Sequence, residues 1–375
     1  MKSENNGDRK RATRNSIYHY LYNCKDFCSR QMLANELGLS LPTVYQNLAE
    51  LMELGLVCGT DEKLSTGGRR VEGLSIVEDA RFAVGASLSD DALRLSAVNL
   101  RLKEIAYKKV SLQHRDDPMF GMRRTCEEVD KFIEEFRIDR SRLLGVGVAL
   151  PGIISKDGLT LEYAPTLGLR GLSLKEIIDN SPYEIHIEND ANCGGGAEWF
   201  VRDGKENIAY LSIEEGIGGA VFTNGAPYFG DNHRSGEFGH ICVEPGGLRC
   251  SCGRQGCLEA YCSSRRISTD LGITLEEFYE GMKKRNIDYY MRWESYLHHL
   301  AVGINNIRMV LDCDVVLGGF MTEYLADSMP RLKEYLASLN PFERSADYVH
   351  LSRQRKHAIP MGATLYFVTK FLEEL

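Results

Sequence analysis

Residues 236–262, GEFGHICVEPGGLRCSCGRQGCLEAYC, hold one histidine and three cysteines at the spacing H-x9-C-x-C-x4-C. The four residues are His240, Cys250, Cys252 and Cys257. One imidazole and three thiolates can close a tetrahedral shell, and this ligand set is typical of Zn²⁺. Gly253 and Gly256 lie between the last two thiols, where a tight turn needs positive φ. Buried cysteines beside an unrelated histidine are the alternative, since the chain has 11 cysteines.

The segments GEFGH, at 236–240, and CSCGRQGCLEAYCS, at 250–263, resemble the zinc-binding signature of the ROK family. That family groups sugar kinases with sugar-responsive transcriptional repressors, and the resemblance extends over nearly the whole chain. It implies a two-lobed α/β domain of the actin and hexokinase type, which is ribonuclease H-like. It also implies that Glu237, His240 and Glu259 face a bound sugar. A closed ligand shell predicts a structural zinc ion that shapes the site.

The composition predicts a soluble, cytoplasmic protein of two or three domains. The chain has 375 residues with 43% hydrophobic content, and no apolar run reaches the length of a membrane span. Residues 1–76 hold ten Lys and Arg against nine Asp and Glu, a net charge of +1, which leaves −9 for the remainder. The acidic remainder is therefore expected to keep its distance from DNA.

The first segment has the layout of a helix-turn-helix. We expect one helix from Arg14 to Cys24, a second from Arg30 to Leu37 capped by Ser29, and a third capped by Ser40. The apolar face of the third helix consists of Val44, Leu48, Leu51 and Leu54. This order is typical of DNA-binding units, although three-helix units also serve as dimerisation modules.

Polar residues on the third helix are the predicted DNA contacts. We place Thr43, Tyr45, Gln46 and Asn47 on its outward face, where they can hydrogen-bond to base edges and phosphates. A basic cluster, residues 9–14, precedes the first expected helix.

The segment STGGRRVEGLSI, residues 65–76, resembles the wing of the ROK repressors, with Arg69 and Arg70 available to a phosphate or a narrow minor groove. ROK kinases generally lack such an extension. We therefore predict a winged helix-turn-helix domain over residues 1–76 and a ROK sugar-binding domain with the zinc site over residues 77–375.

Two turns that bind phosphate in ROK kinases are altered. The kinases carry Asp-x-Gly-Gly-Thr in the first hairpin, whereas this chain has Ser87-Leu88-Ser89-Asp90-Asp91. Glu214 and Glu215 precede the glycine turn that begins at Gly216. Carboxylates placed where a polyphosphate would approach repel it. We therefore expect that the protein is not an enzyme.

The motif Glu-Asn-Asp-Ala-Asn at residues 188–192 supplies two further ligand candidates, Asn189 and Asp190. By resemblance, Asp190 matches the general base of the kinases, but a carboxylate there can also bind sugar hydroxyls without chemistry. The alternative for Asp190 is a helix N-cap. Thr166 stands where the sugar kinases usually have Asn, so a different sugar selectivity is expected.

The sequence therefore favours a sugar-responsive transcriptional regulator. Its N-terminal domain would bind operator DNA as a homodimer or tetramer, and its ROK domain would bind a sugar or sugar phosphate. One alternative is an ATP-dependent sugar kinase with a DNA-binding extension, and another is a zinc-stabilised protein-interaction module. Xylose, glucose, N-acetylglucosamine and their phosphates all suit carboxylates that bind hydroxyl groups.

Overall fold

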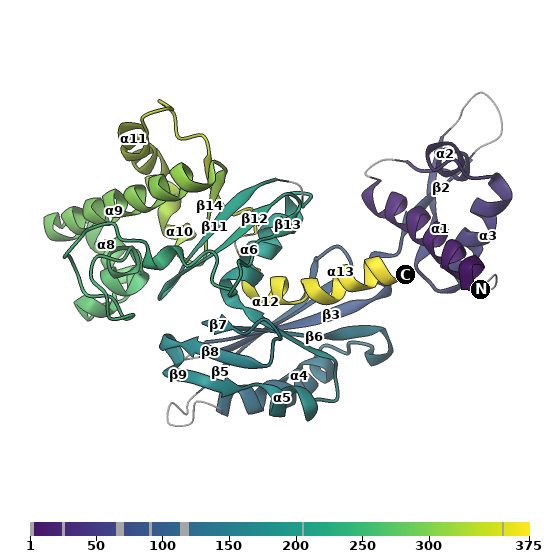
Figure 1. Ribbon diagram of the computed structural model, residues 1–375, viewed down its shortest axis with the longest axis horizontal. Coiled ribbons are helices and arrows are strands. Elements are labelled where there is room, and N and C mark those ends of the chain that lie inside the picture. Colours follow the sequence, from purple (N-terminus) through teal and green to yellow (C-terminus); the bar gives the residue numbers. More distant parts are fainter. Residues whose placement is uncertain are drawn as a thin grey trace.

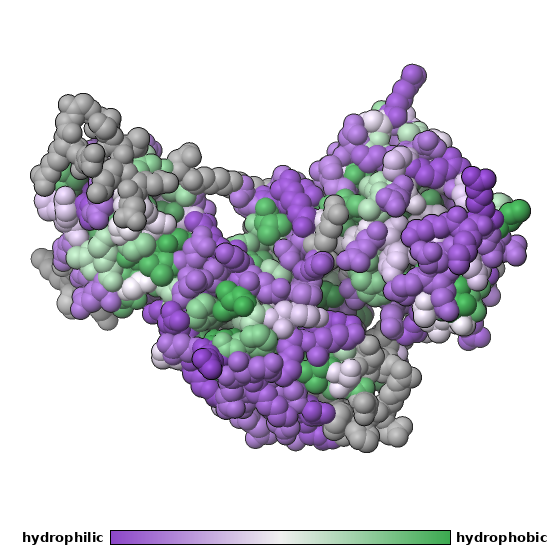
Figure 2. Space-filling model, turned by 180° about the vertical axis from the view of Figure 1, so that it is seen from behind, coloured by the Kyte–Doolittle hydropathy of each residue, from purple (hydrophilic) through white to green (hydrophobic). Residues whose placement is uncertain are grey.

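The computed structural model describes residues 4–24, 27–64, 71–89, 92–112, 120–204, 206–354 and 356–375. These residues form an N-terminal unit and two α/β lobes, which Figure 2 shows from behind as three bulges. Figure 1 shows the C-terminal helix α13 extending from between the lobes to the N-terminal unit. The C-terminal end of the chain therefore lies against the N-terminal unit.

The N-terminal unit consists of three helices and one β-hairpin. They are α1 (Glu4–Asn23), α2 (Arg30–Glu36), α3 (Leu41–Glu53), β1 (Val57–Leu64) and β2 (Val71–Ile76). Both predicted caps are confirmed, because the hydroxyls of Ser29 and Ser40 accept hydrogen bonds from the amides of Met32 and Thr43, each at 3.3 Å. These bonds satisfy amides that have no partner inside their own helix.

Helix α1 begins at Glu4 rather than at Arg14, so the predicted basic arm is helical. Lys10 Nζ lies 2.5 Å from Glu50 Oε1 of α3. The guanidinium groups of Arg11 and Arg14 donate to carbonyl groups at the end of α13. The first turns of α1 contain few apolar side chains, so hydrophobic periodicity did not indicate them. These three cationic side chains therefore make contacts within the protein, to α3 and to the end of α13.

The first lobe has a five-stranded sheet in the order β10-β6-β3-β4-β5. Its strands are β3 (Phe82–Leu88), β4 (Ala92–Asn99), β5 (Glu104–Ser111), β6 (Leu143–Leu150) and β10 (Ile185–Asn189). Strands β10, β6 and β3 are parallel, whereas β4 and β5 pair antiparallel. Helices α4 (Phe120–Glu135) and α5 (Lys175–Asp179) cover one face (Figure 1). A small sheet of β7 (Ile153–Ile154), β8 (Thr160–Ala164) and β9 (Leu169–Ser173) extends this lobe.

The second lobe repeats the plan with the strand order β13-β12-β11-β14-β15. The strands are β11 (Ile208–Ile213), β12 (Ile217–Thr223), β13 (Ala226–Pro227), β14 (Asp314–Gly318) and β15 (Val349–Leu351). Its helices are α6 (Asp190–Val201), α7 (Glu259–Cys262), α8 (Leu275–Lys283), α9 (Ile287–Leu311), α10 (Thr322–Leu325) and α11 (Met329–Leu339). Leu300 and Ile304 of α9 are fully buried in the core beneath this sheet. Among the described residues, no helix is both long and apolar enough to cross a membrane.

Helix α12 (Ala358–Ala363) joins the two lobes by direct backbone contact. A Cβ atom on Gly362 would lie 1.7 Å from the carbonyl oxygen of Cys193 in α6. A Cβ atom on Gly147 of β6 would lie 1.8 Å from the carbonyl oxygen of Ala363. Only glycine permits approaches this close. Helix α13 (Leu365–Glu374) continues from this crossing toward the N-terminal unit (Figure 1).

The N-terminal unit shares a hydrophobic core with the first lobe and α13. Ile17 and Tyr18 of α1 are fully buried in the same cluster as Leu100 and Phe367. The hydroxyl of Tyr22 donates to the carbonyl oxygen of Leu100 at 2.6 Å. Strand β2 ends at the last residue of the predicted first domain, but the core continues across that point. The unit is therefore held by packing as well as by its linker.

We expect the substitution Gly362→Ala to destabilise the protein by about 3 kcal/mol, because the added methyl group meets backbone rather than a movable side chain. The measurement is thermal unfolding of the full-length protein followed by circular dichroism. The melting temperature should fall by several degrees.

Gly7→Ala is the matched control, because Gly7 lies in α1 with no heavy atom within 4 Å of its would-be Cβ. Alanine should stabilise that helix by up to about 1 kcal/mol. A Gly362→Ala protein that melts at the wild-type temperature would show that the crossing can relax.

Candidate functional site

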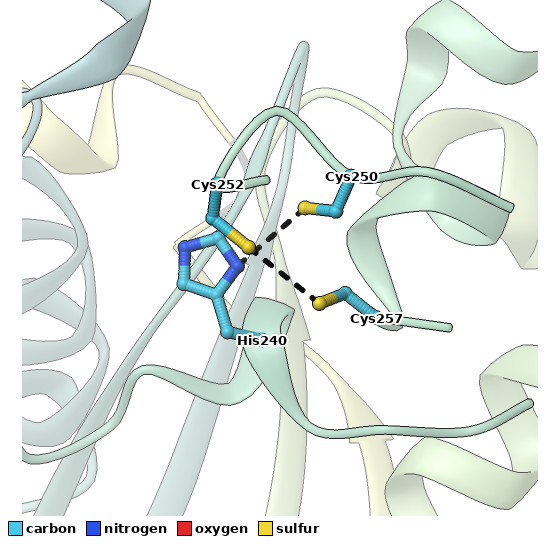
Figure 3. A group of neighbouring side chains, drawn as sticks. All are labelled: His240, Cys250, Cys252 and Cys257. Carbon is cyan, nitrogen blue, oxygen red and sulfur yellow. Dashed lines mark hydrogen bonds between the residues drawn. The ribbon is translucent and has the colours of Figure 1, made fainter. Parts of the chain in front are cut away.

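The imidazole of His240 and the thiols of Cys250, Cys252 and Cys257 point toward one another (Figure 3), and their four ligand atoms all lie within 4.8 Å of one another. The Sγ atoms of Cys252 and Cys257 are 3.7 Å apart. Cys250 Sγ lies 3.7 Å from Nδ1 of His240. Bonds of about 2.3 Å from zinc to sulfur and about 2.1 Å to nitrogen place tetrahedral ligands roughly 3.6–3.8 Å apart. The four side chains therefore fit a tetrahedral metal ion.

The loop that carries the three thiols turns where the sequence predicted. Gly253 and Gly256 have φ values of +90° and +84°. The amide of Gly253 donates to the carbonyl of Cys250 at 3.0 Å, and the amide of Cys250 donates to the carbonyl of Arg254 at 2.8 Å. This compact turn brings Cys250 and Cys252 to the same side as Cys257, which precedes α7.

The two ring nitrogens of His240 face different groups. Nδ1 faces the Cys250 thiol, whereas Nε2 lies 3.9 Å from Oε2 of Glu237. A histidine that binds a metal through one nitrogen commonly uses the other in a hydrogen bond that fixes the ring. The geometry therefore leaves Nε2 directed toward the carboxylates and Nδ1 directed toward the thiols.

Glu259 connects the Cys/His cluster to the glycine turn. Its Oε1 accepts a hydrogen bond from the Ser251 hydroxyl at 2.8 Å and lies 3.6 Å from Cys250 Sγ. Its Oε2 accepts a hydrogen bond from the amide of Ile217 at 3.1 Å. One carboxylate thus links the thiol loop to the glycine turn, two segments that are far apart in the sequence.

The first residues of α6 place Asp190 at the site. Asn189 is the N-cap of this helix, because its Oδ1 accepts from the amide of Asn192 at 2.9 Å, and its Nδ2 donates to the carbonyl of Gly152 at 2.8 Å. Asp190 is the first helical residue, with Oδ1 accepting from the amide of Ala191 at 2.8 Å. The alternative of Asp190 as the N-cap is therefore wrong. Both ends of the Asn189 side-chain amide are therefore used in hydrogen bonds that hold the start of α6.

The glycine turn between β11 and β12 lies against the start of α6. A Cβ atom on Gly218 would lie 2.7 Å from the Cβ of Ala191, so β12 packs directly on the first helical turn. Glu214 is half-buried there, and the charge of Asp190 acts on it. The carboxylate of Glu215 instead lies 3.3 Å from the guanidinium of Arg265, with 60% of its side chain exposed. Of the two predicted carboxylates, only Glu214 interacts with Asp190.

Burial raises the pKa values of three carboxyl groups near the start of α6, those of Asp190, Glu214 and Glu237. Burial, reinforced by the nearby Glu237, raises the pKa of Asp190 to about 6. Burial and the charge of Asp190 raise the pKa of Glu214 to about 7, although Arg94 acts in the opposite direction. Burial also raises the pKa of Glu237, with a further contribution from Glu259. These shifts mark one region of negative potential.

Two residues of this region were missed from the sequence. Glu188 accepts from the amide of Asn189 at 2.7 Å and from Nδ2 of Asn192 at 3.0 Å, and its place in the Glu-Asn-Asp-Ala-Asn motif was the available signal. Arg234 lies 3.2 Å from Glu162 of β8 and so connects the loop before Glu237 to the first lobe. No local pattern could predict a pair separated by 72 residues.

Some predicted residues fall outside the described part of the chain. Arg69, Arg70, Asp90 and Asp91 lie outside the described residues, and so does the side chain of Thr166. Ser87 is described and is buried in β3, opposite Arg94 of β4. A cavity of about 860 Å³ lies elsewhere, beside α9, and is lined by Tyr261, Arg266, Arg292 and their neighbours. None of the predicted ligand or metal residues lines it, so the carboxylates define the site.

The predicted DNA-binding face of α3 is only partly exposed. Tyr45 is 57% exposed and Gln46 is also exposed, while Thr43 is half-buried. Asn47 is only 3% exposed, and its Nδ2 donates to the carbonyl of Thr43 at 2.8 Å. The prediction that Asn47 points outward is therefore wrong. It follows Val44 by three residues and so lies on the buried face of the helix.

We expect Glu214→Gln to stabilise the protein more at pH 8 than at pH 5. The folded-state pKa of Glu214, about 7, lies above its ordinary value of 4.5, so its favourable contribution is complete at low pH and is lost as the pH rises through about 7. A neutral amide avoids this loss. The gain in unfolding free energy at pH 8 should be on the order of 1–2 kcal/mol, measured by thermal or denaturant unfolding at both pH values.

Glu215→Gln is the control, because its carboxylate is exposed and paired with Arg265. It should change the melting temperature little at either pH. Equal stabilisation by Glu214→Gln at pH 5 and pH 8 would contradict the assignment of a buried, shifted carboxyl group.

The chain matches known proteins along most of its length. The model of the ROK family matches residues 96–369. The chain is 29% identical over 293 residues to the xylose repressor of Bacillus subtilis (strain 168), a match that covers 74% of each protein.

Two solved structures share the fold at 19% sequence identity. A ROK family transcriptional regulator, a homolog of the E. coli MLC protein, matches with a TM-score of 0.75 and covers 97% of both chains. A ROK family glucokinase from Streptomyces griseus, in complex with glucose and AMPPNP, matches with a TM-score of 0.65 and covers 76% of this chain and 98% of its own. With the family model matching well over half of its residues, this protein belongs to the ROK family.

Proposed function

We propose that this protein is a sugar-responsive transcriptional repressor. The observation that carries the proposal is the extent of the two structural matches. The regulator structure covers nearly the whole chain, whereas the glucokinase structure leaves about a quarter of it unmatched, although 98% of the glucokinase itself is covered. The N-terminal unit of residues 1–76 is about a fifth of the chain. A repressor has a use for such a unit, and a kinase does not require one.

In this proposal the N-terminal unit is a winged helix-turn-helix over residues 1–76, and the remainder is the sugar-binding domain. Helix α3 enters the major groove and presents Thr43, Tyr45 and Gln46 to base edges and phosphates. The segment that joins β1 to β2 contributes Arg69 and Arg70 as the wing. Because one recognition helix reads only a few base pairs, the chain acts as a homodimer or tetramer on a two-fold operator.

The effector site consists of Asp190, Glu237, His240 and Glu259. Carboxylates accept hydrogen bonds from pairs of neighbouring hydroxyl groups, and Nε2 of His240 adds a polar contact. The site lies at the start of α6, and α6 packs on α12. Binding of a sugar therefore changes the affinity for the operator through the placement of the N-terminal unit.

The metal in this proposal is Zn²⁺, held by His240 and the three cysteines. Bound there it supplies a structural cross-link without an open coordination position. Glu259 transmits the order of the thiol loop to the glycine turn. The chain's own carboxylates, and not the metal, contact the effector.

An ATP-dependent sugar kinase is the second candidate, and Asp190 is the observation that favours it. Its carboxyl group has a pKa raised to about 6, which suits a general base. Against this, Glu214 and Glu215 precede Gly216 in the turn that would have to receive ATP. Incubation with ATP, Mg²⁺ and a panel of sugars, with detection of sugar phosphate, distinguishes the two functions.

We expect the purified full-length protein to contain about one zinc ion per chain, measured by mass spectrometry of the metal. Cys252→Ser should lose the metal and lower the melting temperature by several degrees, because the shell loses one of its four ligands. Treatment of the wild-type protein with a chelator should have the same effect.

Cys242→Ser is the control, because Cys242 is exposed in the same loop but is not among the four ligand residues. It should retain the metal. Wild-type protein that loses zinc without any change in melting temperature would contradict the structural role.

We expect the full-length protein to bind DNA from upstream of its own gene at least about 100-fold more tightly than random DNA, and one sugar should change that affinity. The measurement is fluorescence anisotropy at a fixed salt concentration of about 0.15 M, since phosphate contacts make affinity depend on salt. Gln46→Ala should weaken binding to the operator about tenfold or more while leaving binding to random DNA nearly unchanged.

Gln31→Ala is the control, since its side chain is occupied by a hydrogen bond to Asn35 within α2. It should change operator affinity less than twofold. Equal binding to every DNA sequence tested would contradict the repressor function, and sugar phosphorylation would then support the kinase.

A further inference from the structure

Carboxylates gather at the glycine turn that packs on the start of α6. Glu214 belongs to this turn, and Glu259 Oε2 accepts a hydrogen bond at 3.1 Å from the amide of Ile217 at the end of the turn. Asp190 raises the pKa of Glu214, Glu237 raises that of Asp190, and Glu259 raises that of Glu237. Each of these groups therefore lies within electrostatic range of the next. An anion that approaches this turn is therefore repelled by several negative charges of the protein.

Two amides of the first turn of α6 already donate to side chains of the protein. Helix N-termini bind phosphate through unpaired amides of the first turn. Here the amide of Ala191 donates to Asp190 Oδ1 at 2.8 Å, and the amide of Asn192 donates to Asn189 Oδ1 at 2.9 Å. The protein's own side chains thus occupy two of the donors that a phosphate group would use.

The glycine turn is occupied in the same way. The amide of Ile217 donates to Glu259 Oε2 at 3.1 Å, and the amide of Glu214 donates to the carbonyl of Gly216 at 2.9 Å. A carboxylate already lies where the turn could receive an anion. The second backbone element suited to phosphate is therefore also filled by a negative charge of the protein.

Two arginines act on these carboxylates. Arg94 and Arg234 act on Glu214 and Glu237, but Arg234 is also paired with Glu162 at 3.2 Å. A zinc ion bound by three thiolates and one imidazole has a net charge of −1, so the Cys/His cluster adds no positive potential. Within the described residues, the carboxylate of Glu214 makes no hydrogen bond or ion pair, so it remains available to accept a hydroxyl group.

We infer that Glu214 is a specificity-determining residue that excludes anionic groups, so that the effector is an uncharged sugar and not a sugar phosphate. This inference rests on the proposed function, because it concerns the ligand of the same site. Glu214 stands out because its side chain can be changed without removing any hydrogen bond among the described residues.

The test is isothermal titration of the full-length, zinc-loaded protein with matched pairs of ligands at pH 8. The pairs are glucose and glucose 6-phosphate, N-acetylglucosamine and its 6-phosphate, and xylose and xylose 1-phosphate, which keeps the pyranose ring. At this pH Glu214, with a pKa of about 7, is mostly ionised. For the sugar that binds, the phosphate ester should bind at least tenfold more weakly. Glu214→Gln should reduce that ratio at least threefold, whereas Glu215→Gln should leave it unchanged.

The outcomes separate this inference from the proposed function. A phosphate ester that binds as tightly as its parent sugar, or a ratio that Glu214→Gln leaves unchanged, overturns the inference and leaves a sugar-responsive regulator. Failure of all six compounds to bind overturns the sugar-effector part of the proposed function and this inference with it. Thermal unfolding of each variant at pH 8 verifies that the protein titrated is folded.

Discussion

The backbone contact of α12 with α6 and β6 is the constraint on which the rest of the structure depends. Two sheets with their own cores must be held side by side, and side chains at the crossing would separate them. Gly362 and Gly147 remove those side chains, so carbonyl oxygens of neighbouring elements approach the glycine Cα atoms directly. A contact of this kind has little freedom to adjust, because backbone atoms cannot change rotamer. The relative position of the two lobes is therefore set at this crossing.

Helix α6 extends this constraint from the carboxylate site to the N-terminal unit. It begins with Asp190, and near its other end the fully buried Glu198 accepts hydrogen bonds from the amides of Arg353 and Gln354, at 2.8 and 3.0 Å. That segment leads directly into α12 and α13, and the carbonyl of Glu373 in α13 accepts from Asn15 of α1 at 3.1 Å. A buried carboxylate is stable only when its hydrogen bonds are satisfied, so this junction is rigid. Packed elements thus connect the carboxylate site to the N-terminal unit.

The sequence predicted the elements that have strong periodicity and could not predict contacts between distant segments. Helices α2 and α3 begin at the serine caps as expected, and the apolar side chains of Val44, Leu48 and Leu51 lie on the buried face of α3. The first turns of α1 were missed because their stability comes from ion pairs and from the end of α13. Asn47 was placed outward from its polarity, although its spacing from Val44 put it on the buried face. The ligand atoms of the Cys/His cluster were foreseen from spacing alone, whereas the position of Glu214 beside Asp190 depends on how β12 packs on α6.

Glu259 connects the Cys/His cluster to the carboxylates at the start of α6. Glu259 holds the thiol loop through Ser251 with one oxygen and holds the glycine turn through Ile217 with the other. The turn in turn positions Glu214 against Asp190. Disorder of the thiol loop would therefore release the glycine turn, so the Cys/His cluster helps to set the position of the carboxylates.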